Sequence, residues 1–483
     1  MATQNRILIL KKAQDLILIA FLFLLPWQTR YIWHYGQLNG GYWEYGTGSI
    51  YATEILLWII LILFFVNNFL NKEVWAGLIR RKNILAPVFL LFLAVLGFSV
   101  VFSENIGVSY GYVFHILEGM ALMTVLVRSG QSFAVIPTAV EGSLIPNQKD
   151  SSITLRSNWN DKYLYAIWLG AVGQGMLAMY QFLNQSVFAS KWLGMAGQEA
   201  YNLGPSVIEF ADQRWLRAYG SFGSPNSLGI YLAVLFVLGL ILYLKTESPR
   251  YKILISIGQL FVLSGLLVSF SRGAWLAAVA GVLCLFIILI YKRKPSFPPQ
   301  AGIQAIGSDT RFPLAAGMTN LKEFAKQIVF VLAVVVFWVA IFYPVFNARF
   351  NLQNRLEIKS VAERQEQYSG SLAFIKVNSV LGVGPGAYTY ALYKKYSNLA
   401  SWQYQPIHNI YLLGVVEMGV VAAVLLAFLI ANFAKMIIKN NIIYLPVLTA
   451  LLVSGLFDHW LASLFTGIML WWVIWGLGLK RNS

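Results

Sequence analysis

The feature that most constrains this chain is a succession of long apolar segments. Twelve of them lie along the 483 residues, each near the length of about 20 residues that a helix needs to cross a bilayer. They cover residues 13–29, 52–71, 84–102, 109–127, 163–183, 227–245, 253–270, 274–291, 328–346, 408–434, 442–460 and 463–479. Charged residues make up only 12% of the chain and the mean hydropathy is +0.64, which excludes a soluble globular or a disordered protein. We predict an all-α polytopic membrane protein with about 12 transmembrane helices, a single integral membrane domain over residues 1–483.

The net charge of +16 is explained by topology. If both termini lie on one side, that side holds two thirds of the 36 Lys and Arg residues, so the positive-inside rule makes it the cytoplasm. The opposite side carries nearly equal numbers of basic and acidic residues. We therefore expect a multi-pass protein of the cytoplasmic (inner) membrane with cytoplasmic termini, the lipid bilayer as its surroundings, and no nucleic acid partner.

Four connections between the spans are long. Residues 129–162 and 292–327 are rich in Pro, Gly, Ser and Gln and are expected to be flexible cytoplasmic loops. Residues 184–226 and 347–406 are expected to be folded outer loops, because they carry aromatic residues and helical patterns. The second contains apolar positions that fit amphipathic helices on a membrane surface.

Cysteine and histidine are too scarce for most metal sites. The single cysteine, Cys284, excludes a disulfide framework and a cysteine cluster, and only four histidines are present. We therefore predict neither a metal nor another cofactor.

Arg217 and Arg272 are candidates for binding an anion. Arg217 precedes a glycine-containing turn, and Asn226 opens the following helix, where backbone N–H groups can bind a phosphate. The local pattern fits an interfacial arginine equally well. Arg272 lies in a very short connection between two spans, where a charge is costly unless it is paired or used.

The long outer loop at 347–406 offers further candidates. Arg364 is one of its seven basic residues, so its own pattern is weak evidence. Gly384 and Gly386 belong to a turned glycine segment that lacks the βαβ context of a dinucleotide site.

His408 opens the tenth apolar segment from the outer side. A neutral histidine at a water-accessible membrane edge can accept a proton, and the adjacent Asn409 can orient a ligand. Asp458 and His459 form a second acidic and imidazole pair, for which bonding between helices is an equally good explanation.

Four blocks, taken in order, resemble the O-antigen ligase and polysaccharide polymerase family of membrane glycosyltransferases. They are RAYGSFGSPNSLGIYLA from residue 217, SFSRGAWLA from residue 269, AERQEQY with NSVLGVGPGAY between residues 362 and 388, and HNIYLLGVVEMG from residue 408. The resemblance implies a GT-C-like fold with a long helical outer loop between the ninth and tenth spans. Each block is weak alone, but their order and spacing make the combination fairly specific.

Membership of that family implies a donor, an acceptor and roles for the candidate residues. The donor is a glycan on a polyprenyl pyrophosphate, and the acceptor is a hydroxyl of a glycan, lipid or protein. Arg217 and Arg272 match pyrophosphate-contacting arginines, Arg364 is a further candidate, and His408 matches the histidine proposed to activate the acceptor. The reaction is expected to be metal-independent and inverting, since arginines can stabilise the leaving pyrophosphate in place of Mg²⁺.

Three alternatives remain open at this point. The blocks do not separate a ligase from a polymerase, although they resemble the ligase branch slightly more. A flippase for lipid-linked sugars or a small-anion transporter would instead favour charges at the bilayer midplane. A polymer-binding scaffold without catalysis would not need the arginines and the histidine.

Overall fold

The computed structural model describes residues 2–69, 85–129, 153–210, 212–291, 314–351 and 354–480. Most of the two predicted cytoplasmic loops lies outside these residues. The structure does describe the last part of each, where residues 153–162 belong to a helix and residues 314–327 to another.

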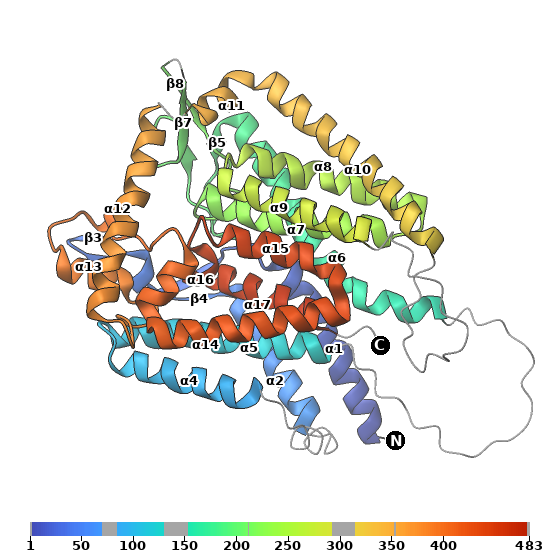
Figure 1. Ribbon diagram of the computed structural model, residues 1–483, viewed down its shortest axis with the longest axis horizontal. Coiled ribbons are helices and arrows are strands. Elements are labelled where there is room, and N and C mark those ends of the chain that lie inside the picture. The colour runs from blue at the N-terminus through green and yellow to red at the C-terminus, as the bar shows by residue number, and fades with distance from the viewer. Residues whose placement is uncertain are drawn as a thin grey trace, which may run out of the picture.

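The described residues are mostly helical, and every predicted apolar segment contains a helix (Figure 1). The larger helices are α1 (Ala2–Leu24), α2 (Ala52–Phe69), α4 (Leu85–Val101), α5 (Ile106–Arg128), α6 (Ile153–Asn184), α7 (Pro225–Lys245), α8 (Pro249–Val268), α9 (Arg272–Tyr291), α10 (Leu314–Ile341), α12 (Arg355–Val377), α14 (Ile410–Asn441), α15 (Leu445–Ser454) and α17 (Phe465–Leu479). Three shorter helices are α11 (Tyr343–Phe350), α13 (Tyr388–Lys395) and α16 (Trp460–Ser463). This content agrees with bilayer chemistry, because a helix bonds its own backbone polar groups.

Seven helical stretches in the described residues are long and apolar enough to cross a membrane. They are Ile106–Arg128, Lys162–Asn184, Pro225–Lys245, Pro249–Val268, Arg272–Tyr291, Asn320–Ile341 and Ile410–Ser454. Shorter apolar helices lie at Ala52–Asn68, Pro87–Val101 and Phe465–Leu479. The chain is thus a helical protein with multiple candidate membrane spans, and the number of twelve spans stays a prediction.

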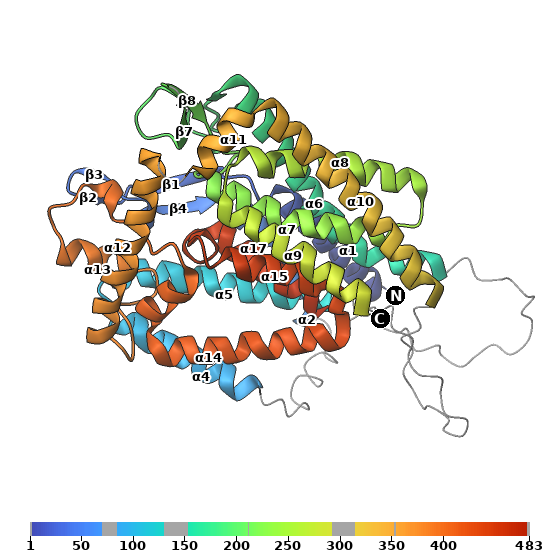
Figure 2. The same ribbon diagram turned by 45° about the horizontal axis from the view of Figure 1, so that its top comes forward.

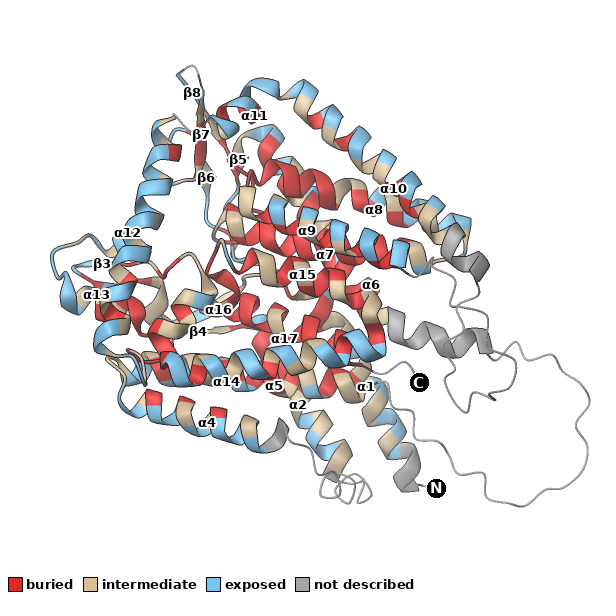
Figure 3. Ribbon diagram, in the orientation of Figure 1, coloured by how far each residue is buried: buried red, intermediate tan, exposed pale blue. Residues whose placement is uncertain are grey.

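Helix α7 forms the centre of the bundle. It packs against α6, α8, α9 and α15, and 94% of its span is buried, whereas 22% of the α10 span is. Figure 3 shows this gradient, with buried residues concentrated in the inner helices and exposed ones along α4 and α10. Ser224 caps α7 by accepting from the backbone N–H of Asn226, and Pro225 occupies the first turn, which favours helix initiation.

Short strands and helices gather at the end of the molecule opposite the two termini, called the distal end below (Figures 1 and 2). Four two-stranded antiparallel sheets pair β1 (Arg30–His34) with β4 (Gly48–Tyr51), β2 (Gln37–Leu38) with β3 (Gly41–Tyr42), β5 (Ser186–Val187) with β6 (Gln198–Glu199), and β7 (Val207–Phe210) with β8 (Gln213–Leu216). Residues 184–226 therefore fold as strands and turns, where a helical pattern was expected. Residues 347–406 contain the helices α12 and α13, and Tyr368 and Leu372 of the predicted apolar face of α12 are exposed.

Helix α14 is interrupted at Gly419, whose φ is +76°. The segment 379–384 fills the break: Val383 and Gly384 donate their backbone N–H groups to the carbonyls of Val416 and Glu417, and Val420 donates to Ser379. Backbone groups that the helix leaves unpaired are thus bonded to a loop that precedes it in the chain.

Candidate functional site

The turn before α7 is held by glutamines from the apolar helix α6. The side-chain oxygen of Gln181 accepts from the backbone N–H groups of Tyr219 and Gly220, at 3.0 and 2.8 Å. Gly220 has φ +58°, and a Cβ there would lie 2.5 Å from the side chain of Gln174. The glycine is therefore required both by the backbone conformation and by the close approach of α6.

Arg217 enters this turn directly from β8 and is buried. Its Nε donates to the carbonyl of Ser269 at 2.8 Å, and one terminal nitrogen donates to Oδ1 of Asn226 at 2.7 Å. Among the described residues no carboxylate lies within ion-pair distance of Arg217. Burial, with a further contribution from Arg349, lowers the pKa of Arg217 to about 9. A bound anion would offset that loss of hydration.

Arg272 begins α9 and shares a buried carboxylate with a second arginine. Its guanidinium lies 2.6 Å from Oε2 of Glu357 in α12, and Arg349 in α11 pairs with Oε1 of the same residue. The Nε of Arg349 also donates to the carbonyl of Phe270 at 2.9 Å. One carboxylate therefore faces two guanidinium groups, which leaves a net positive charge.

Arg364 completes this cationic group. It lies seven residues after Glu357 in α12, so that both side chains project from one face of the helix. Arg272, Arg349 and Arg364 line one small cavity, called the arginine cavity below, together with Asn226 and Asp458. Its volume of about 20 Å³ admits a single water-sized probe. A pyrophosphate can enter only if neighbouring groups move.

His408 lies beside the arginine cavity and faces Asp458. Its Nδ1 is 3.5 Å from Oδ2 of Asp458, which is within ion-pair range but longer than an ordinary hydrogen bond. The other oxygen, Oδ1, accepts from the backbone N–H of Trp460 at 2.9 Å. Asp458 is buried, so the facing imidazole of His408 is the group that can balance its charge.

A second imidazole, that of His459, packs against the first. The two ring centres are 5.0 Å apart, and Nδ1 of His459 lies 2.6 Å from the hydroxyl of Ser463. His459 is buried, which disfavours the protonated form of its ring. A carboxylate that faces one imidazole nitrogen can orient the ring and stabilise its protonated form, which leaves the other nitrogen to accept a proton.

The structure thus brings Arg217, Asn226, Arg272, Arg364 and His408 together. The contacts that join them pass through residues for which the sequence analysis assigned no ligand role: Arg349, Glu357 and Asp458. The pairing of Asp458 with His408 across the fold was not foreseen, and Arg349 looked like any of the seven basic residues of its loop. The sequence indicates only that Arg349 lies a few residues before α12, and this is not specific evidence for a ligand-binding role.

Three of the predicted supporting residues have structural contacts instead. Oδ1 of Asn409 accepts from the backbone N–H groups of Tyr411 and Leu412, both at 3.0 Å, and so caps α14. Gly384, at φ +107°, packs against Ser103. The N–H of Gly386 donates to the carboxylate of Glu417 at 2.9 Å. These contacts fix the segment that fills the break in α14.

Within the part of the chain that the structure describes, two side-chain groups have the composition of metal ligands. His408, Asp458 and His459 place their ligand atoms within 4.8 Å of one another, and so do Glu54, His115 and Glu118. The first group shares its histidine and carboxylate with the proton-accepting arrangement. Dependence on a metal is therefore a question for a chelator experiment.

Comparison with known proteins supports the resemblance described above. Residues 257–427 match the family model described as O-antigen ligase, which is about a third of the chain. The match contains Arg272, Arg364 and His408, whereas Arg217 and Asp458 lie outside it. No curated protein matches the chain. The resemblance to the O-antigen ligase family is thereby confirmed through this segment.

Proposed function

We propose that this protein, whose residues 257–427 match the O-antigen ligase family, is a membrane glycosyltransferase that moves a glycan from a polyprenyl pyrophosphate to an acceptor hydroxyl. The observation that carries the proposal is the junction at Asp458, which lines the arginine cavity and also faces His408. A site for an anionic leaving group therefore adjoins a candidate general base, which is the arrangement that such a transfer needs.

The chain's own groups fit each part of the bond change. The acceptor oxygen attacks the anomeric carbon as the bond from that carbon to the pyrophosphate oxygen breaks, and direct attack inverts the anomeric centre. The hydroxyl proton goes to the free imidazole nitrogen of His408, and Asp458 stabilises the resulting cation. The electron pair leaves with the pyrophosphate, whose charge Arg217, Arg272, Arg349 and Arg364 would stabilise.

The pyrophosphate would replace a contact that the protein already makes. Glu357 forms ion pairs with Arg272 and Arg349, which line the arginine cavity. The phosphate groups of a donor would compete with Glu357 for the same guanidinium nitrogens. Arginine suits this exchange because its planar fork binds carboxylate and phosphate in similar geometry. Donor binding is thus coupled to a displacement of Glu357 or of α12, which carries it.

We also infer that the distal end faces away from the cytoplasm. The described helix ends that lead into the connections predicted to be cytoplasmic lie at the opposite end, and the positive-inside rule assigns that end to the cytoplasm (Figure 1). Reporter fusions or accessibility labelling at the C-terminus and in residues 347–406 test the orientation. A cytoplasmic distal end would overturn the assignment.

The decisive experiment is reconstitution of the full chain in nanodiscs with a polyprenyl-pyrophosphate glycan, candidate acceptors and EDTA. A new glycosidic bond, formed with release of polyprenyl pyrophosphate, supports the proposal. Products that are extended repeat units identify a polymerase, and products on another acceptor identify a ligase.

A parallel experiment separates the proposal from transport. Proteoliposomes report whether lipid-linked glycan or a small anion crosses the bilayer. Transport without formation of a glycosidic bond would overturn the proposal, and loss of transfer in EDTA that Mg²⁺ or Zn²⁺ restores would overturn metal independence. For variants of the buried arginines, Arg355→Ala serves as the matched control. Arg355 lies on α12 but is exposed and pairs with Glu209.

A further inference from the structure

A second and much larger cavity opens at the distal end, called the aromatic cavity below. Its volume is about 770 Å³, within the range of small-molecule binding sites. Aromatic side chains dominate its lining: Trp33, Trp43, Tyr45, Tyr51, Trp58 and Phe114. Most of these come from residues 30–58, which lie outside the segment matched by the family model.

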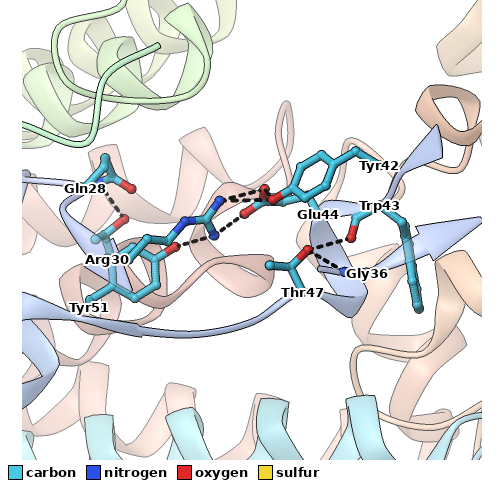
Figure 4. A network of polar contacts seen from close by, with 9 residues as sticks. Gln28, Arg30, Gly36, Tyr42, Trp43, Glu44, Thr47 and Tyr51 are labelled. Carbon is cyan, nitrogen blue, oxygen red and sulfur yellow. Dashed lines mark hydrogen bonds and ion pairs between the residues drawn. The ribbon is translucent and has the colours of Figure 1, made fainter. Parts of the chain in front are cut away.

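One wall of the aromatic cavity is fixed by a closed polar network (Figure 4). The guanidinium of Arg30 binds Glu44 through both terminal nitrogens, at 2.6 and 2.9 Å, and the hydroxyl of Tyr42 donates to the same carboxylate at 2.5 Å. Tyr51 accepts from Arg30 at 3.4 Å. Such a bidentate pair holds the β1–β4 ribbon in one geometry and neutralises the arginine within the wall.

His408 and His459 do not line the aromatic cavity themselves, but residues of its lining contact this imidazole pair. Its lining includes Tyr45, whose ring lies 5.9 Å from that of His459, and Ser463, whose hydroxyl contacts Nδ1 of His459. Pro406, two residues before His408, also lines it. The arginine cavity reaches the pair through Asp458. A molecule in the aromatic cavity would therefore lie near His408 and His459 while it contacts other residues than a molecule that is bound to the arginines.

The two cavities differ in charge. Arg30 is the single Lys or Arg in the described lining of the aromatic cavity, and Glu44 occupies it. The lining also contains Glu54 and Glu417, for which no Lys or Arg lies within ion-pair distance among the described residues. An anionic ligand would therefore find no unpaired Lys or Arg among the described lining residues, and His115, which also lines the cavity, is paired with Glu118 at 2.9 Å. Hydroxyl groups would find carboxyl oxygens and flat aromatic faces.

We propose that the aromatic cavity binds the acceptor through an uncharged carbohydrate portion, which places a hydroxyl at His408. The inference rests on the transfer function proposed above. Aromatic rings pack against the apolar C–H faces of sugar rings, and carboxyl groups bond their hydroxyls. The lack of a free cation disfavours glycans that carry phosphate or carboxylate groups in the bound portion.

The test measures glycan binding without relying on transfer. The probes are soluble oligosaccharides with free hydroxyl groups, divided into a neutral pool without charged groups and an acidic pool that carries phosphate or carboxylate groups. Saturation-transfer NMR with the full chain in nanodiscs compares wild type, Trp33→Ala and Trp192→Ala. Trp192 is the matched control, because it is 87% exposed and does not line either cavity.

The neutral pool should bind to wild type, about fivefold more weakly to Trp33→Ala, and unchanged to Trp192→Ala. Preferential binding of the acidic pool, or equal binding by Trp33→Ala and wild type, would overturn the inference.

Separate measurements with Arg272→Ala keep the two proposals distinct. This variant should bind neutral glycans as wild type does and lose affinity for polyprenyl pyrophosphate. If it transfers glycan normally, the role of Arg272 at the leaving group fails; if wild type forms no glycosidic bond, the proposed function fails. Neither result depends on glycan binding in the aromatic cavity.

Discussion

Lining residues of both the arginine cavity and the aromatic cavity contact the pair His408 and His459, but the two cavities are built from opposite chemistry. The first is small, cationic and closed by Glu357, and most of its residues lie within the family match. The second is large, aromatic and without a free cation in the described residues, and it is built mainly by residues 30–58 and 105–115. The difference suggests that the anionic leaving group and the acceptor are recognised by separate parts of the chain, with the histidines between them.

Replacing the shared histidine should have the largest effect. His408→Ala removes the proton acceptor, so kcat for transfer should fall by about 10² to 10⁴, while affinity for polyprenyl pyrophosphate stays unchanged. Transfer by the purified variant and binding of the donor lipid are measured on the same nanodisc preparation. Wild-type turnover in His408→Ala would show that the two cavities do not meet at a catalytic histidine.

Substitution on the cationic side should come next. Arg272→Ala should lower transfer by about 10² to 10³, because a charge that stabilises the leaving pyrophosphate is lost. Arg272→Lys should restore only part, since a lysine cannot make the bidentate contact. Transfer rates are compared with those of the exposed control Arg355→Ala.

A double variant separates ligand binding from a structural role of this arginine. Arg272→Ala leaves Glu357 paired with Arg349 alone, so the group becomes neutral, and adding Glu357→Gln restores the net positive charge that the wild-type group carries. If Arg272 serves the donor, the double variant stays inactive. Recovery of transfer would show instead that Arg272 only neutralises Glu357.

Substitution of Asp458, which lines the arginine cavity and faces His408, should have a smaller effect on transfer. Asp458→Asn keeps an acceptor for the backbone N–H of Trp460 but removes the charge that faces His408, so kcat should fall about 10-fold to 100-fold. Donor affinity should change little, because the arginines remain. A loss confined to donor affinity would assign Asp458 to the arginine cavity alone.

The smallest effect is expected in the wall of the aromatic cavity. Glu44→Gln weakens the contact with Arg30 and should lower the free energy of unfolding by about 1 kcal/mol at neutral pH. Burial raises the pKa of Glu44, but the hydrogen bond from Arg30 lowers it more, so the pKa lies below its ordinary value. The stabilisation is therefore present above about pH 4 to 5 and is lost as the pH falls through the lowered pKa.

Thermal unfolding of wild type and Glu44→Gln between pH 3 and pH 8 checks this expectation. The difference should shrink on acidification. Glu363→Gln is the control, since Glu363 is exposed and its contact with Lys359 is long, at 3.8 Å. A difference that does not depend on pH would mean that the charge of Glu44 does not hold the wall.

The helical fold followed from the sequence, because long apolar segments permit few other structures in a bilayer. Arg217, Arg272 and His408 could also be selected as candidate site residues. Each lies near the start of an apolar segment, where a polar or charged side chain is costly unless it is paired or binds a ligand. What could not be predicted is the pairing that depends on tertiary contacts: Glu357 between two arginines, and Asp458 opposite His408.

Two local features did not reveal their structural role in the sequence. Asn409 caps α14 through its side-chain oxygen, and its role in orienting a ligand stays a prediction. Residues 30–51 gave no strong periodicity, because the paired strands are at most five residues long and their burial does not alternate cleanly. The aromatic cavity that these residues help to form therefore escaped sequence analysis.

The break in α14 has a consequence for the order in which the chain is made. An unpaired backbone group in hydrocarbon costs several kcal/mol, so the region around Gly419 is unfavourable in a membrane by itself. The loop that bonds this region, residues 379–384, precedes α14 and leaves the ribosome first. Each newly made copy of α14 can therefore find its partner already synthesised, and a circular permutant that begins between residues 386 and 408 would reverse that order and should insert poorly.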